Sequence, residues 1–249
     1  MNNLVSIITP SYNSSKFIEE CVNSVISQTF QNWEMIIVDD GSNDNSRDII
    51  SDLSAKEKRI KSIFLEENVG SAESRNVAIK QSKGRYIAFL DSDDIWNEDK
   101  LEKQISFMNE KDIAFSFTSY QTISEDGKTK YSVITAPNKM CYHSYLKNTI
   151  IGCLTVIIDK EKTGDFQMPN IRSSHDMALW LLIMKRGFSA YGLDENLAYY
   201  RIVSNSNTSK KWKAAKEVWD VYRKVEKLNI IYSVYNFIGY AYNAIKKRM

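Results

Sequence analysis

The first 120 residues alternate short apolar runs with segments of helical period. Runs such as 33–38 are typical of buried strands, whereas Phe17, Cys21 and Val25 recur every four residues and indicate an amphipathic helix. Strands that alternate with helices favour parallel pairing, so we expect an α/β fold whose central sheet is mostly parallel, Rossmann-like and flanked by helices. The expected strands are 4–9, 33–38, 60–65, 85–90 and 113–120, and the expected helices cover 17–26, 49–53, 71–82 and 101–108.

The pattern changes after Tyr120. The turn residues 125–127 separate two strand-like runs and predict a hairpin. Further along, the sequence predicts a strand over 152–158, a helix over 174–185 capped by Ser173 or Ser174 and ended by Gly187, an extended segment over 191–202, and a mainly helical, aromatic and basic tail over 210–249.

Polar residues follow the ends of four expected strands, in the clusters 10–14, 39–46, 66–70 and 91–94. In open α/β sheets, ligands bind at the carboxyl ends of the strands. We therefore expect these four loops to form one cleft.

The pair Asp91 and Asp93 ends the expected fourth strand. Side chains two apart in a strand point the same way, so these two carboxylates lie close and repel each other. A divalent cation with hard oxygen ligands would offset that repulsion. The alternative is an acidic turn that caps the next helix.

Two other loops carry groups suited to a nucleotide. Asp39 or Asp40 could accept hydrogen bonds from a nucleobase or a ribose, although an Asx turn that starts the next helix explains them equally well. Tyr12 could stack on a base and Ser11 could bond to a base or phosphate; alternatively, Pro10 marks an ordinary strand-to-helix turn.

Two charged residues on expected helices complete the candidates. Arg75 follows a glycine turn and could reach a phosphate or a pyrimidine carbonyl, or it could form a surface ion pair with Glu73 or with a neighbouring helix. Asp176 falls in a first helical turn, where the helix dipole favours an ionised carboxylate suited to general-base catalysis. Simple helix capping is the alternative for Asp176, and Leu179 and Trp180 are expected in the core.

Composition narrows the classes of function. The chain has 249 residues, 43% of them hydrophobic and 26% charged, which is typical of a globular protein. The net charge of +2 gives no case for nucleic acid. Three widely spaced cysteines, the absence of a basic leader segment and the absence of a long apolar run predict reduced thiols in a cytoplasmic protein.

Five segments in order, VSIITPSYN, VDDGS, ENVGSAESRN, GRYIAFLDSDD and SSHDMALW, resemble family 2 glycosyltransferases with the GT-A fold, over residues 4 to about 205. The resemblance implies that 1–205 is the catalytic domain, with a nucleotide-sugar-binding half (1–120) and an acceptor half (121–205), followed by a helical tail (206–249). It implies inverting transfer of a sugar from a nucleotide sugar, a UDP-sugar, to an acceptor hydroxyl, with Mg²⁺ or Mn²⁺. A lipid-linked saccharide in O-antigen or capsule assembly is the acceptor it suggests.

The resemblance also implies a role for each matching residue. Asp40 would contact the base with support from Asp39, Asp176 would be the catalytic base, and Asp93 would be the principal metal ligand, with Asp91 facing the ribose or the metal. The remaining nucleotide-sugar residues would be Pro10, Ser11, Tyr12, Arg75, Ser92 and Arg201, with Ser204 to Ser206 in the same closing loop as Arg201. On the acceptor side, His175 stands where the family usually has Glu, and Trp180 lies on the same helix.

Two rival functions and one further surface stay open at this point. A sugar-phosphate nucleotidyltransferase shares the cleft but needs a glycine-rich basic loop that is absent near the first strand. An inactive nucleotide-sugar-binding scaffold has only His175 in its favour. The aromatic tail with its basic end fits peripheral docking on the inner face of the plasma membrane, or packing on the core or on a partner subunit of a homodimer.

Overall fold

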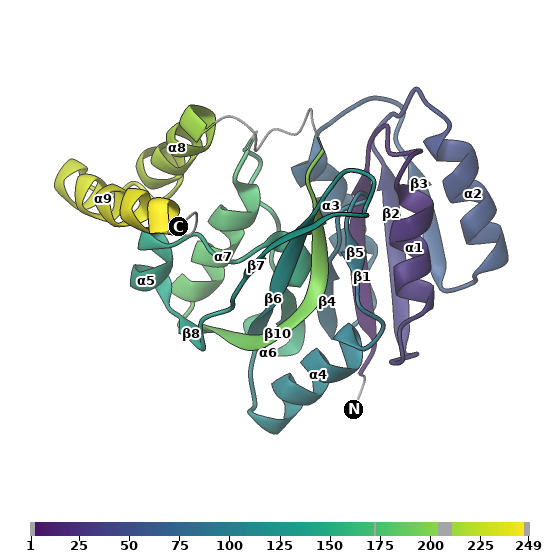
Figure 1. Cartoon of the computed structure of the whole chain (residues 1–249), viewed down its shortest axis with the longest axis horizontal. Coiled ribbons are helices and arrows are strands. Elements are labelled where there is room, and N and C mark those ends of the chain that lie inside the picture. Colours follow the sequence, from purple (N-terminus) through teal and green to yellow (C-terminus); the bar gives the residue numbers. More distant parts are fainter. Residues whose placement is uncertain (1–2, 172, 204–210, 247–249) are drawn as a thin grey trace.

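A mixed sheet lies at the centre of the computed structural model, which describes residues 3–171, 173–203 and 211–246 (Figure 1). Within these residues the sheet has ten strands in the order β3-β2-β1-β4-β9-β6-β10-β5, with β7 paired to β6 and β8 to β10. The strands are β1 (Val5–Ser11), β2 (Trp33–Asp39), β3 (Ile60–Phe64), β4 (Tyr86–Phe89), β5 (Ile95–Trp96), β6 (Phe115–Ile123), β7 (Lys130–Ile134), β8 (Lys139–Met140), β9 (Ile157–Asp159) and β10 (Ala190–Arg201).

Helices cover both faces of this sheet. Ile7 and Ile8 on β1 point to opposite faces, as successive strand residues must, and each joins a separate core cluster. Helices α1, α2 and α4 pack on the Ile7 face, and α3, α5 and α7 pack on the Ile8 face. The helices are α1 (Ile18–Ile26), α2 (Ser46–Lys56), α3 (Ser71–Gln81), α4 (Lys100–Glu110), α5 (Tyr142–Lys147), α6 (Lys160–Thr163), α7 (His175–Lys185), α8 (Lys211–Asp220) and α9 (Ile230–Lys246).

The first half of the sheet confirms the expected parallel pairing. Strand β1 pairs in parallel with β2 and β4, and β2 pairs in parallel with β3, so their carboxyl ends meet at one edge. The hairpin predicted at 125–127 is also present, between β6 and β7.

The second half corrects one expectation. Residues 152–158 do not form one strand, because Cys153–Thr155 make a 3₁₀ turn and only Ile157–Asp159 pair in the sheet. The resulting strand β9 runs antiparallel between β4 and β6 and joins the two halves.

The tail is helical, as expected, but it is broken. A π-helical turn over Val221–Val225 separates α8 from α9, and Val221 and Tyr222 in that turn are buried in the core. Among the residues that the structure describes, no helix combines the length and the apolar character needed to cross a bilayer. Ser204 to Ser206, predicted to close over a diphosphate, lie outside the described residues.

Candidate functional site

The carboxyl ends of β1 and β2 bring the first two polar loops together. Ser11 pairs with Asp39 in the parallel register, and the next amide, that of Asp40, donates to the Ser11 carbonyl over 2.8 Å. Pro10 and Ser11 are buried, whereas the Tyr12 ring is half exposed beside them. Of these three residues, Tyr12 is therefore the one with a surface available for stacking on a base.

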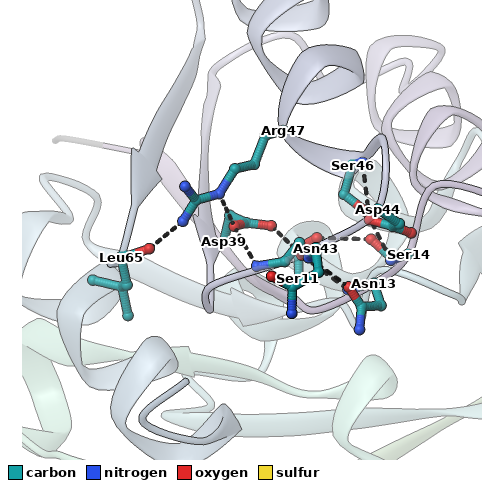
Figure 2. Close-up of polar contacts among 10 residues, drawn as sticks. Ser11, Asn13, Ser14, Asp39, Asn43, Asp44, Ser46, Arg47 and Leu65 are labelled. Atoms are coloured by element: carbon teal, nitrogen blue, oxygen red, sulfur yellow. Dashed lines mark hydrogen bonds and ion pairs between the residues drawn. The ribbon is translucent and has the colours of Figure 1, made fainter. Parts of the chain in front are cut away.

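Asp39 shapes the loop that follows β2. Its fully buried carboxylate accepts hydrogen bonds from the Ser42 amide and hydroxyl and an ion pair from Arg47, whose guanidinium also donates to the Leu65 carbonyl (Figure 2). Both carboxylate oxygens are thus used inside the protein. Asp39 therefore exposes no oxygen to a ligand, and the Asx turn that starts the next helix is made by Asp44, whose carboxylate accepts from the Ser46 amide.

A second network ties the same loop to the end of β1. The Asn43 amide donates to the Asn13 side chain over 2.9 Å, and the Ser14 amide donates to the Ser46 hydroxyl over 2.8 Å (Figure 2). Burial alone would raise the pKa of Asp44, but hydrogen bonds from Ser46 and from Ser15 outweigh it and lower the pKa to about 2. The two loops therefore form one rigid wall of the cleft.

Asp40 connects this wall to the loop after β3. Its buried carboxylate accepts from the amides of Val69 and Gly70 over 2.8 and 2.9 Å. The neighbouring Gly41 has φ +74°, and a Cβ there would lie 2.9 Å from the Glu67 carbonyl carbon. Asp40 and Gly41 thus fix the start of α3, where Arg75 lies.

Arg75 is buried and bridges three elements. One terminal nitrogen forms an ion pair with Asp91 at the end of β4, and the other contacts His175 Nε2 at the start of α7 over 2.6 Å. The surface pair with Glu73 considered from the sequence is therefore wrong, because the guanidinium points into the protein. The guanidinium is planar and has donors on both terminal nitrogens, so it can bind two partners at once.

The contact with Arg75 fixes the state of His175. A guanidinium only donates, so Nε2 must accept and the ring must be neutral, with its proton on Nδ1. Burial, and then the charge of Arg75, lower the pKa of His175, which agrees with the neutral ring. A Glu at this position would instead add a negative charge beside Arg75.

The acidic loop after β4 holds three carboxylates. Burial, and then the charge of Asp91, raise the pKa of Asp93 to about 6, and burial together with Asp93 raises the pKa of Asp94 well above its usual value. Asp94 Oδ2 is buried without a hydrogen-bond partner among the described residues. The loop therefore holds carboxylates whose burial and mutual repulsion Arg75 and Arg201 offset only in part.

A divalent cation fits this donor set. Mg²⁺ and similar ions are commonly held by one or two carboxylates together with substrate phosphates, and not by a complete protein cage. The described residues contain no group of three or more His, Cys, Asp or Glu side chains that could hold a metal. Asp93 and Asp91 are the residues that would supply the oxygens.

Arg201, at the end of β10, holds the acidic loop in place through hydrogen bonds. Its amide donates to Asp94 Oδ1 over 2.9 Å, and its guanidinium donates to the carbonyls of Asp93 and Glu125 and to the Glu20 carboxylate. Every guanidinium nitrogen is thus already bound to a protein oxygen. Arg201 therefore orders the loop, and its contact with a diphosphate stays a prediction.

Helix α7 presents Asp176 beside this group. Asp176 lies in the first turn, as predicted, is partly exposed, and has no hydrogen bond or ion pair with another described residue. Ser174 stands at the N-cap with φ +55°, but its side chain makes no capping hydrogen bond. The Asp176 carboxylate is therefore available to an incoming hydroxyl.

Trp180 does not belong to the acceptor side. It is fully buried and packs against Phe89 and Phe115, with ring centroids 5.3 and 5.4 Å away. It follows Asp176 by four residues on α7, but its ring fills the core beneath β4 and β6. The core position expected for Leu179 and Trp180 is confirmed.

Three residues of the site were missed in the sequence. Arg47 and Glu20 act only through partners distant in the sequence, and no local pattern marks them. Asp94 had a signal, because it is the third acid of the segment DSDD.

Comparisons with known proteins agree with this geometry. Residues 6–167 match the family described as Glycosyl transferase family 2. The chain is 54% identical to the putative teichuronic acid biosynthesis glycosyltransferase TuaG of Bacillus subtilis (strain 168), over 99% of this chain and 98% of TuaG. It is 40% identical to the UDP-Glc:α-D-GlcNAc-diphosphoundecaprenol β-1,3-glucosyltransferase WfgD of Escherichia coli, over 98% of this chain and 94% of WfgD.

Solved structures share the fold. S. aureus TarS 1–349 in complex with UDP-GlcNAc superposes with a TM-score of 0.73 at 22% identity, over 95% of this chain and 71% of that one. Mannosyltransferase PcManGT from Pyrobaculum calidifontis, in complex with GDP-Man and Mn²⁺, gives a TM-score of 0.71 at 14% identity, over 99% and 71% of the two chains. This chain is therefore a glycosyltransferase that belongs to glycosyl transferase family 2 and adopts the GT-A fold.

Proposed function

We propose that this enzyme transfers a sugar, with inversion, from a UDP-sugar to a hydroxyl of a lipid-linked saccharide during the assembly of a surface polysaccharide such as O-antigen or capsule. The observation that carries the proposal is the meeting of Asp91 and the start of α7 around the buried Arg75. Arg75 thus links the acidic loop to the first turn of α7, which also carries Asp176. The names of TuaG and WfgD support the polysaccharide setting and the lipid-linked acceptor.

In this proposal, residues 1–120 bind the nucleotide sugar and residues 121–205 bind the acceptor. Tyr12 stacks on the base, and the rigid wall made by Asp39, Asp40 and their partners positions the nucleoside. Mg²⁺ or Mn²⁺, held by Asp93 with Asp91, would stabilise negative charge on the departing nucleoside diphosphate.

Asp176 acts as the general base. The acceptor oxygen attacks the anomeric carbon from the face opposite the diphosphate, the bond to the diphosphate oxygen breaks, and the hydroxyl proton passes to the Asp176 carboxylate. Neutral His175 holds Arg75 against Asp91 and adds no charge next to the base.

The test is a transfer assay on the full chain. We expect product from UDP-glucose and a GlcNAc-diphospholipid with Mn²⁺, and none with EDTA. Asp176→Asn should lower kcat by about 10²–10⁴-fold, the usual contribution of a general base, and leave the Kd for UDP within about twofold. Asp48→Asn, which changes an exposed first-turn carboxylate on α2, is the matched control and should keep full activity.

Two results would contradict the proposal. Wild-type kcat in folded Asp176→Asn would assign the base to another group. Full activity in EDTA would remove the metal from the reaction.

A further inference from the structure

Helix α9 exposes its apolar side chains. Positions three or four apart lie on one face of a helix, and the residues at such positions here form a single stripe. The stripe, exposed between 44% and 81%, consists of Ile231, Val234, Tyr235, Ile238, Tyr242 and Ile245. Most amphipathic helices on a globular protein turn such a stripe toward the core.

The opposite face of α9 is the one that contacts the protein. Ser233 and Asn236 are fully buried, and the Asn243 side chain donates to the Lys147 carbonyl at the end of α5 over 3.0 Å. A Cβ on Gly239 would lie 3.0 Å from the Lys147 Cβ, so glycine permits the close approach of the two helices. These contacts fix the rotation of α9 about its axis. The stripe stays outside, except that the Tyr235 hydroxyl accepts a hydrogen bond from Lys147 Nζ over 3.0 Å.

Aromatic anchoring adds to the exposed surface. The Phe237 ring packs on Trp219 at 5.5 Å and holds α9 beside α8. Figure 1 shows α8 and α9 at the margin of the molecule, beyond α5 and α7. Tyr235 and Tyr242 in the stripe, and Trp212 on α8, leave more than half of each side chain exposed. Tyr and Trp are the residues that favour the interface between water and lipid.

The net charge of this tail is opposite in sign to that of the rest of the chain. Residues 210–249 contain ten Lys and Arg against three Asp and Glu, a net charge of +7, whereas residues 1–209 contain 23 against 28, a net charge of −5. The exposed cations of the described part are Lys213, Lys216, Arg223, Lys224 and Lys227. Because the tail is positive and the rest of the chain is negative, an anionic surface attracts the tail and repels the rest.

We propose that α9 lies in the headgroup region of an anionic lipid bilayer, with the Ile231–Ile245 stripe inserted and the basic tail against the lipid phosphates. A second copy of the chain is a poorer occupant, because it would bring a second +7 tail to the same surface. The inference does not depend on the proposed reaction, since binding needs neither donor nor acceptor.

The position of α9 determines how far the bilayer would lie from the candidate base. Helix α9 packs on α5, and α5 packs on α7, whose first turn carries Asp176. The bilayer would therefore lie two helices away from the candidate base, on the half of the molecule assigned to the acceptor.

The test is flotation of the full chain with vesicles of phosphatidylglycerol and phosphatidylcholine. Ile231→Ser with Ile238→Ser should lower the apparent partition coefficient by at least about tenfold, because two exposed apolar side chains are lost. The control pair, Tyr131→Ser with Val133→Ser, removes two exposed apolar residues from β7, each about half exposed, and should bind like the wild type. Raising the salt to 0.5 M, or using phosphatidylcholine alone, should weaken wild-type binding.

Several outcomes would overturn the inference. The α9 pair could bind vesicles as well as the wild type, or the wild type could ignore anionic vesicles altogether. Sedimentation could also show a wild-type dimer that the α9 pair abolishes without any binding to vesicles, which would assign the stripe to a second copy. Thermal melting of each variant checks that it is folded; both substitution pairs change exposed side chains.

Discussion

Arg75 is the residue on which the donor loops and the acceptor helix meet. It is almost fully buried, whereas its partner Asp91 keeps 31% of its side chain exposed. Arg75→Met would leave Asp91 and His175 without their cation. Breaking a fully buried ion pair costs about 3–5 kcal/mol, and the partial exposure of Asp91 reduces this to about 2 kcal/mol here.

Urea unfolding measures that loss. The control is Lys103→Met, which breaks exposed pairs with Asp99 and Glu195 and should leave the midpoint close to that of the wild type. Equal midpoints for the Arg75 variant and the control would mean that the bridge contributes nothing to stability.

Lys100 provides a pH-dependent test at the same scale. It is fully buried, lies 4.7 Å from the Trp96 ring centroid and donates to Gln104, and burial lowers its pKa to about 7. Between that value and the ordinary pKa near 10.5, the unfolded chain binds a proton that the folded chain does not. The free energy of unfolding therefore rises with pH in this window, by at most about 1.4 kcal/mol per pH unit, and the full penalty is present below pH 7.

Lys100→Met should remove this contribution. Denaturant unfolding at pH 7.5 and 9.0 gives the slope for each protein, and the wild-type slope should be the more positive one. Parallel slopes would show that Lys100 stays protonated in the folded state.

At the scale of elements, Gly41 controls how two loops pack. It combines a left-handed φ with a close approach to the Glu67 backbone, so Gly41→Ala must strain one loop and displace the other. We expect a loss of about 2–3 kcal/mol in stability and a weaker affinity for UDP. Gly187→Ala is the control, because φ there is +98° but no atom lies within 4 Å of the new Cβ.

Gly187→Ala should lose only about 1 kcal/mol, the strain of φ alone, and keep its affinity for UDP. Calorimetric titration with UDP and thermal melting separate the two effects. If both variants bound UDP like the wild type, the two-loop wall would have no part in binding the nucleoside.

Local patterns predicted the elements that are long enough to show a period. The alternating runs of the first 120 residues became β1 to β4, α1 to α4 and β6, because each buries a continuous face. Strands β5 and β8 have two residues each, which is too short for any period to appear. Insertion of β9 between β4 and β6 depends on pairing between distant segments, which no local pattern contains.

The same limit applied to the candidate site: residues next to a predicted element could be identified from the sequence, and contacts between distant segments could not. Asp176 at the start of α7 and the acidic loop after β4 were predictable, since each directly follows a recognisable boundary. The contact between Arg75 and His175 spans 100 residues and could not be read locally. Arg201 was predicted to contact a ligand, which stays a prediction, and its hydrogen bonds to three separate segments of the protein could not be read from the sequence.

At the scale of the whole molecule, the sheet joins the two halves of the chain, whereas net charge sets the tail apart from both of them. The sheet joins the first and second halves of the chain through β9, so β1 to β10 share one framework. Helices α8 and α9, in the segment that carries the +7 charge, lie outside that sheet, and α9 packs mainly on α5 and the π-helical turn. Removing α9 should therefore affect vesicle binding far more than the arrangement of Arg75, Asp91 and Asp176.

The place of β10 in the sheet has a consequence for the order of folding. This strand is the last of the sheet in sequence, yet it lies between β6 and β5. Its final residue is Arg201, which donates a hydrogen bond to the acidic loop. During synthesis, β1, β2 and β3 can pair soon after they emerge, because β1 pairs with β2 and β2 with β3, whereas β4 follows its partner β1 by about 80 residues and β5 must wait about a hundred residues for β10. Strands β1 to β3 would thus be paired on the ribosome well before the acidic loop is ordered, because that loop gains its hydrogen bonds to Arg201 only after residue 201 has emerged.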